Sequence, residues 1–231
     1  MTIARGTFGD QVAREIIKEI QERRLQPGDE IPAEGELAER HGVNRLSVRE
    51  AIRILVARGV LLSSQGRRAR VATPSPAVLE QIIAFRLSQE SMDLRDLLET
   101  RRVIEGELAR RAAVRVAEGL GGTEQAELAL QAMRTASDSP ESFIAADLAF
   151  HDAVKELADA QVFSFILTAL NGVLLDARRA SYLGRERRGT GQQATIDEHA
   201  RILHAIAEGD GEAAAEAMTV HLAQTGHDLG L

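Results

Sequence analysis

The 231-residue sequence contains no cysteine, so disulfide bonds and thiolate metal ligands are excluded and a reducing cytoplasm is the expected location. No apolar run approaches the roughly 20 residues of a membrane-spanning helix, and the N-terminal residues do not resemble a signal peptide. Aromatic residues are scarce, at 3% of the chain. Alanine, leucine, glutamate and arginine are abundant instead, and with 44% hydrophobic residues they predict a folded, mainly α-helical protein.

Positive charge is concentrated near the N-terminus, although the whole chain has a net charge of -7. Residues 1–72 hold 13 Lys and Arg against 10 Asp and Glu, whereas residues 73–231 hold 15 against 25. Within the first part, residues 41–72 contain seven arginines and one glutamate. A small basic module joined to a larger acidic one indicates a polyanionic partner for the first module, although a solvated basic surface without a partner is the alternative.

The predicted elements of the basic module follow the order of a winged helix-turn-helix. Apolar residues at helical spacing predict helices over about 7–24, 34–41 and 44–57. Two short strands then flank a turn at 65–68. In such a domain the second helix of the pair enters the major groove of DNA with its N-terminal residues near the base edges. Double-stranded DNA is therefore the expected partner.

Two arginines lie where this arrangement needs them. Arg45 is at the N-terminus of the 44–57 helix, and Arg49 follows one turn later on the same face. Arginine suits guanine edges and bidentate phosphate contacts. At the hairpin tip, Gly66 allows the backbone to approach DNA closely, beside further arginines that reach phosphate or the minor groove.

The acidic part is predicted to be a bundle of six or seven antiparallel helices. Residues 73–76, "TPSP", are polar and rich in proline, and they read as a linker between residues 1–72 and 77–231. The expected helices cover residues 77–89, 93–118, 123–136, 140–158, 161–183, 192–207 and 211–226.

The stretch "LQPGDEIPAEGELAERHGVNRLSVREAIRILVARGVL" resembles the DNA-binding domain of the GntR family of bacterial transcription regulators. Residues 73–231 resemble the all-helical ligand-binding FCD domain of its FadR subfamily. The resemblance implies a dimer that binds two half-sites of an operator, with repression relieved by an effector as the usual arrangement. We expect the DNA-contacting residues to be Asn44, Arg45, Ser47, Arg49, Gln65, Gly66, Arg67 and Arg68.

Within the DNA-binding domain, the chain departs from the family pattern in two places. The family usually has Ser-Glu-Arg where residues 33–35 read Ala-Glu-Gly, so a helix cap worth roughly 1 kcal/mol and one DNA contact are missing. The wing, usually Gly-Lys-Gly-Thr, has Arg-Arg-Ala at residues 67–69, and this added charge is expected to replace the phosphate contact. Arg53 and Arg58 are expected on a solvated helix face.

Four polar residues fall on predicted buried stripes of the bundle. Asp147 and His151 are four residues apart and point the same way, while His199 and His221 lie on inward stripes of two later helices. Burying a carboxylate and three imidazoles on inward faces needs a shared purpose. These donors suit Zn, Ni, Co or Mn, and from the pattern alone a hydrogen-bonded polar core is an equal alternative.

The resemblance favours the metal. In the metal-binding branch of these regulators, an Asp-x-x-x-His helix and two later histidines ligate a divalent ion. Here "DLAFH" supplies Asp147 and His151, and His199 and His221 occupy the remaining positions, with zinc the first expectation. His204 lies off the pattern and is expected at the surface.

Arg101 is also predicted to point inward, with Glu105 one turn away. An internal ion pair is one explanation. The family motif Glu-x-Arg matches residues 99–101, and it implies that Arg101 binds the carboxylate of an anionic effector.

The sequence thus predicts a DNA-binding regulator, a repressor controlled by a small organic acid beside a divalent metal, and not an enzyme. A metal-dependent hydrolase is one alternative, because the same ligands could hold an activated water. No further acid or serine on those stripes presents itself as a general base, however. A regulator that senses the metal alone is the other alternative.

Overall fold

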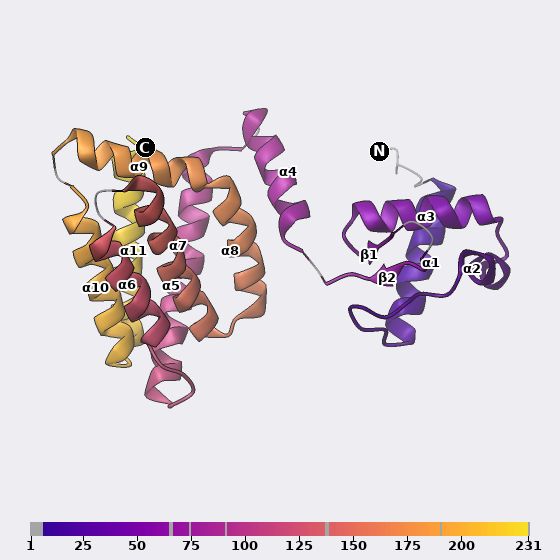
Figure 1. Ribbon diagram of the computed structural model, residues 1–231, viewed down its shortest axis with the longest axis horizontal. Coiled ribbons are helices and arrows are strands. Elements are labelled where there is room, and N and C mark those ends of the chain that lie inside the picture. The colour runs from indigo at the N-terminus through magenta and orange to yellow at the C-terminus, as the bar shows by residue number, and fades with distance from the viewer. Residues whose placement is uncertain are drawn as a thin grey trace, which may run out of the picture. The chain divides into compact units, whose positions relative to one another are not determined.

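The computed structural model describes residues 7–64, 67–73, 75–90, 92–136, 139–189 and 191–230. These residues form eleven helices and one two-stranded sheet (Figure 1). They divide into two compact units, with the division between Val78 and Leu79. The predicted mainly α class, with an N-terminal winged helix-turn-helix followed by a helical bundle, is confirmed.

The N-terminal unit contains α1 (Phe8–Glu22), α2 (Glu34–His41), α3 (Arg45–Ala57), β1 (Leu61–Leu62) and β2 (Arg70–Val71). The strands are antiparallel and form the hairpin that the sequence predicted. Apolar side chains from all three helices and the hairpin make one core, whose buried members include Val12, Ile16, Leu37, Val48, Leu55, Leu61 and Val71.

Local chemistry sets the limits of α2 and α3. α2 ends at Gly42, whose φ of 63° lies in the left-handed region that glycine adopts without strain. The Asn44 side chain then accepts a 2.8 Å hydrogen bond from the Ser47 backbone, which caps the start of α3. At the start of α2, Ala33 gives no side-chain cap, as expected from the departure at residues 33–35.

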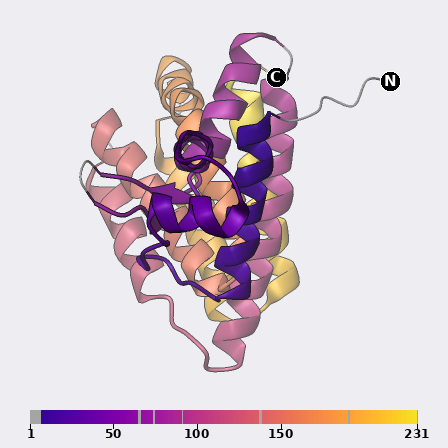
Figure 2. The same cartoon turned by 90° about the vertical axis from the view of Figure 1, so that its right-hand side faces the viewer.

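The C-terminal unit is a bundle of longer helices. α5 and α11 pack against each other along their length, and α7 packs between α5 and α6 (Figures 1 and 2). None of the described helices is long and apolar enough to cross a membrane. The elements are α4 (Ala77–Ser88), α5 (Leu94–Ala117), α6 (Glu124–Thr135), α7 (Pro140–Ala158), α8 (Gln161–Val173), α9 (Leu175–Arg187), α10 (Gln193–Ala207) and α11 (Gly211–Asp228).

The prediction of one helix over 161–183 is wrong, because the chain bends at Leu174 and forms two helices, α8 and α9. Leu174 is completely buried between the two helices, and Gly172, a residue of low helix propensity, lies two positions before it. Beyond the bend, α9 crosses the end of the bundle (Figure 1), and it continues to Arg187.

Candidate functional site

The four polar residues that the sequence placed on buried stripes come together inside the bundle. Asp147 and His151 extend from α7, His199 from α10 and His221 from α11, and one potential ligand atom of each lies within 4.8 Å of all the others. The three histidines are between 0% and 4% exposed. Their ring centroids are separated by 4.3 Å to 5.5 Å. Three helices thus direct one carboxylate and three imidazoles at a single point.

The hydrogen bonding of His199 directs its Nε2 at this point. Its Nδ1 donates a 2.8 Å hydrogen bond to the Thr195 carbonyl oxygen, which can only accept. Nε2 then lies 3.2 Å from Asp147 Oδ1. Among the described residues this buried Nε2 has no hydrogen-bond partner. A cation beside both atoms would satisfy them together.

The other two histidines are oriented by carboxylates behind them. His221 Nδ1 donates to Glu198 Oε2 at 2.8 Å, and His151 Nδ1 faces the Glu105 carboxylate. Burial raises the pKa of Glu198. Burial opposes ionisation of Glu105 too, but Arg101 together with His151 and Arg178 outweighs it and holds the pKa of Glu105 well below its usual range. A carboxylate on Nδ1 fixes the ring and directs Nε2 toward the centre, as outer partners of metal-binding histidines do.

Burial sets the protonation of the cluster. It lowers the pKa of His151 and holds that of His221 well below the ordinary value, so both imidazoles are neutral at neutral pH. Burial opposes ionisation of Asp147, but Arg178 together with His199 and His151 outweighs it and keeps this carboxyl's pKa well below its usual range. Neutral imidazoles and an ionised carboxylate are the forms that bind metal.

The spacing of the donors also suits a metal. Two atoms that each lie about 2.1 Å from one ion are about 3–4 Å apart. Oδ1 of Asp147 lies 3.2 Å from His199 Nε2 and 3.8 Å from His151 Nε2. The residues therefore fit a divalent ion that accepts nitrogen and oxygen ligands, such as zinc, nickel, cobalt or manganese.

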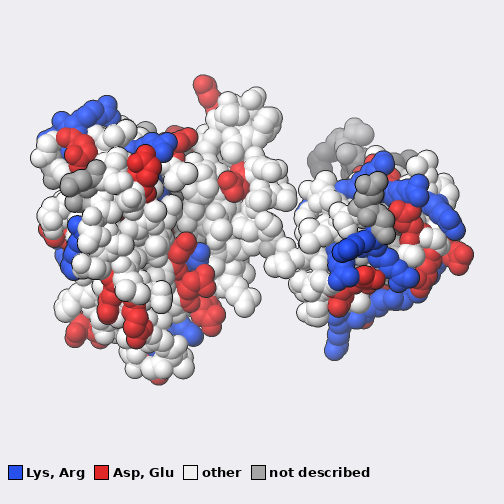
Figure 3. Space-filling model, viewed as in Figure 1, with Lys and Arg blue, Asp and Glu red and all other residues white. Residues whose placement is uncertain are grey.

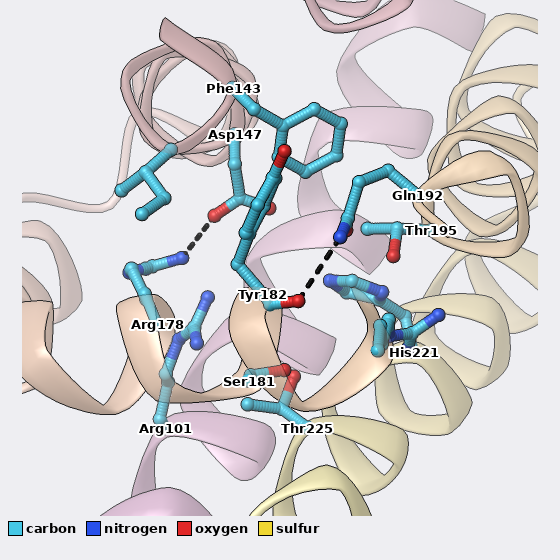
Figure 4. A pocket seen from close by; sticks show the side chains of 12 residues that line it. Arg101, Phe143, Asp147, Arg178, Ser181, Tyr182, Gln192, Thr195, His221 and Thr225 are labelled. Carbon is cyan, nitrogen blue, oxygen red and sulfur yellow. Dashed lines mark hydrogen bonds and ion pairs between the residues drawn. The ribbon is translucent and has the colours of Figure 1, made fainter. Parts of the chain in front are cut away.

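A cavity of about 40 Å³ adjoins the cluster, and Asp147 and His221 form part of its wall (Figure 4). Arg101 of α5 points into it and is 2% exposed. Its Nε donates to Glu105, so the predicted ion pair is present. Its Nη2 is buried without a hydrogen-bond partner in the described structure. One donor of Arg101 is therefore left for a ligand.

Helix α9 adds residues that sequence reasoning missed. Arg178, Tyr182 and Arg185 recur at helical spacing and all line the cavity. Arg178 donates through Nη1 to Asp147 Oδ2 and through Nη2 to the Asn171 side chain. Two features of the sequence could have indicated these residues: the helical spacing of the three, and the Asn171-Gly172 pair, which often forms a turn. Both indicate the site only if one helix ends near residue 173 and a second one follows.

Asp228 at the end of α11 holds α9 in place. Its carboxylate, 1% exposed, accepts hydrogen bonds from Ser181 at 3.0 Å, Arg185 at 2.6 Å and Arg188 at 2.5 Å. Arg185 also lies 3.5 Å from Glu198, the residue that orients His221. The wall formed by α9 is thus linked through charges both to α11 and to the histidine cluster.

In the N-terminal unit, Arg45 and Arg49 are exposed on the first turns of α3. Arg49 pairs with Glu34 at 2.7 Å, yet its side chain remains 60% exposed. A Cβ at Gly35 would lie 3.2 Å from Arg45 Nη2, so the glycine gives the guanidinium room. Figure 3 shows lysine and arginine side chains gathered over this unit, interleaved with acidic ones.

The other predicted DNA-contacting residues differ in their surroundings. Asn44 and Ser47 bond to each other in the α3 cap. Arg67 and Arg68 are exposed beside the hairpin. Gln65 and Gly66 lie outside the described residues.

Neighbouring arginines have local partners. Arg70 pairs with Glu30 at 2.7 Å, and Arg58 pairs with Asp10 at 2.6 Å. Arg53, with its side chain 77% exposed, makes a looser contact of 3.9 Å with Glu50. The exposed positive charge at the start of α3 and at the hairpin therefore belongs mainly to residues 45, 49, 67 and 68.

Both units match known protein families. Residues 8–71 match the family described as bacterial regulatory proteins, gntR family. Residues 96–224 match the FCD domain, which covers the histidine cluster and most of the cavity wall.

Curated relatives match over most of their length. A regulatory protein named for the L-lactate dehydrogenase operon of Escherichia coli (strain K12) is 32% identical over 93% of this chain and 83% of its own. The HTH-type transcriptional regulator LutR of Bacillus subtilis (strain 168) is 29% identical over 88% of this chain and 92% of its own. The Glc operon transcriptional activator of Escherichia coli (strain K12) is 30% identical, over 84% and 78%.

A solved structure described as Streptococcus agalactiae GntR has a similar fold. It is 23% identical, covers 94% of this chain and 98% of its own, and superposes with a TM-score of 0.62.

Asp228→Asn is expected to lower the free energy of unfolding by about 3 kcal/mol, because buried Arg185 loses the nearer of its two carboxylate partners. Urea denaturation measures this loss, and hydrogen exchange should quicken in α9. Asp197→Asn, an exposed change on α10, is the control and should stay within about 0.5 kcal/mol of the parent. Unchanged stability and exchange in Asp228→Asn would mean that other contacts hold α9.

Proposed function

This chain belongs to the GntR family of bacterial regulatory proteins and contains an FCD domain, and from that premise we propose that a metal-bound organic acid controls its binding to DNA. It is a DNA-binding transcription regulator, and its relatives and structural neighbours are regulators rather than enzymes. The observation that carries the proposal is the buried Asp-His cluster beside a cavity with an unpaired arginine donor.

For the DNA-binding half, we assign recognition to residues 1–72, with 73–76 as a linker and 77–231 as the effector-binding and dimerisation domain. Regulators of this family bind operator DNA and are generally dimers. A dimer presents two recognition helices to two half-sites about one helical turn apart. Arg45 and Arg49 read the major groove in this proposal, because both are exposed on the first turns of α3.

For the metal, we assign Asp147, His151, His199 and His221 as ligands, with zinc as the first candidate. The support is the 3.2 Å approach of Asp147 Oδ1 to His199 Nε2 and the buried Nε2 atoms of His151 and His199, which lack hydrogen-bond partners in the described structure. A bound ion would supply a Lewis-acid position for an oxygen of the effector.

For the effector, we assign Arg101 as the residue that binds its carboxylate. The unpaired Nη2 of Arg101 favours an organic anion over a sensor of metal alone. Two relatives are named for operons, and one of these is the operon of L-lactate dehydrogenase. L-Lactate is a small carboxylate.

The effector would act by favouring one arrangement of the bundle. Its cavity is lined by α5, α7, α9, α10 and α11, so an anion inside it changes the forces between these helices. A ligand shifts a conformational equilibrium by its difference in affinity for the two states. Repression relieved by the effector is the proposed mode; the relatives include a transcriptional repressor and a transcriptional activator.

Arg45→Ala and Arg49→Ala are each expected to weaken specific operator binding by roughly 1–3 kcal/mol, because each removes a proposed base or phosphate contact. Fluorescence anisotropy with a labelled operator measures the change. Arg53→Ala, on the same helix and 77% exposed, is the matched control. If both variants bind like the parent, α3 is not the recognition helix.

Purified protein is expected to hold about one divalent ion per chain, and His199→Ala or His221→Ala should each lower that occupancy in elemental analysis. Because metal binding requires neutral imidazoles, affinity should fall on acidification. Since burial lowers the pKa of His151 and His221, the fall should come below the ordinary value of about 6.5. His204→Ala, exposed on α10, is the control.

Failure to take up zinc, nickel or manganese at neutral pH would contradict the metal assignment. The four residues would then be a hydrogen-bonded core.

A small-carboxylate library should change operator affinity in the presence of divalent metal and not in its absence. Arg101→Gln is expected to abolish the response, because the carboxylate loses its charged partner. Arg102→Gln, the more exposed neighbour, should respond like the parent. A response to metal without any carboxylate would identify a metal sensor instead.

A further inference from the structure

A second arginine beside Arg101 also has a donor to spare. Arg178 lines the same cavity, and its buried Nε has no hydrogen-bond partner within the described part of the chain. Burial and the nearby Arg101 charge both lower the pKa of Arg178, which places the two guanidinium groups within electrostatic reach. Figure 4 shows both side chains on the same side of the cavity, below Asp147. Two buried cations with free donors form a site for an anion.

The charges around the cavity are already matched one to one. Each of the three arginines in its wall has a carboxylate partner, in the pairs Arg101–Glu105, Arg178–Asp147 and Arg185–Asp228. At the margin, Arg188 and Glu198 add one charge of each sign. The protein groups described at this site therefore bring no net charge of their own.

A divalent ion changes this balance. Asp147 is the one anionic ligand of the proposed metal site, and its charge is already matched by Arg178. The loaded site therefore has an excess of two positive charges in a buried setting, where uncompensated charge is costly. A ligand with one negative charge removes half of this excess, and a ligand with two removes all of it.

We propose that the effector is a small dicarboxylate, held at one end by Arg101 and Arg178 together and at the other by the metal. This inference rests on the proposed function and narrows it to dianions. Ser181, Thr195, Gln192 and Thr225 line the remaining wall and offer neutral hydrogen-bonding groups to a hydroxyl on the carbon chain.

The cavity is small, and α9 forms one of its walls. Its volume of about 40 Å³ favours a short ligand. A carboxylate that reaches the unpartnered Nε of Arg178 contacts a residue of α9, so the proposed clamp links the ligand to that helix.

The test compares two ligands that differ in one group. L-Malate and 2-hydroxybutyrate have the same four-carbon 2-hydroxy acid skeleton, with a carboxylate in the first where the second has a methyl group. Isothermal titration on the zinc-loaded full-length protein should show malate binding roughly 30-fold more tightly or better. The thermal shift caused by each acid gives an independent measure of this difference in affinity.

Arg178→Gln should reduce the preference for malate to a few-fold, measured on variant protein that elemental analysis shows to hold zinc. Arg179→Gln, exposed on the adjacent position, should keep the parent preference. If Arg178→Gln does not fold, the comparison of the two ligands on the parent protein still tests whether the site prefers a dianion. A parent that binds both acids equally overturns the dianion inference and leaves a metal-bound carboxylate effector intact. A parent that binds neither acid with zinc present contradicts the proposed function itself.

Discussion

The histidine cluster and the attachment of α9 depend on one shared carboxylate. Asp147 is directed by one oxygen at the imidazoles of α7 and α10, and by the other at Arg178 of α9. A buried carboxylate is stable only with such partners, and a partner removed from it leaves an uncompensated charge. The Asp147 carboxylate therefore stabilises α9, the helix that covers the cavity, and also serves as one of the proposed metal ligands.

This sharing gives a physical route from ligand to helix. Any group that draws Arg178 away from Asp147, or draws Asp147 toward an ion, alters the attachment of α9. That helix is held largely by polar links, to Asp147 at one end and to Asp228 at the other, rather than by a broad apolar face. Polar links can be exchanged for ligand contacts at low cost, whereas an apolar core resists rearrangement.

The two units use charge in opposite ways. At the start of α3, Arg45 and Arg49 remain exposed, and the one ion pair, to Glu34, lies in solvent where such pairs contribute little. These arginines are available to phosphates and bases. In the bundle, Arg101 and Arg178 are buried beside matched carboxylates, so their remaining donors are strong attractors for an anion.

The amino-acid sequence by itself determined the fold class, nearly all of the helices and the fact that Asp147 and His151 share a face, because these follow from apolar periodicity and from the four-residue spacing on one helix. It also placed Arg101 inward. Only the tertiary structure decided that Arg178 and Asp228 belong to the site. Both depend on the bend at Leu174, whose side chain is completely buried, and burial among distant segments has no local pattern.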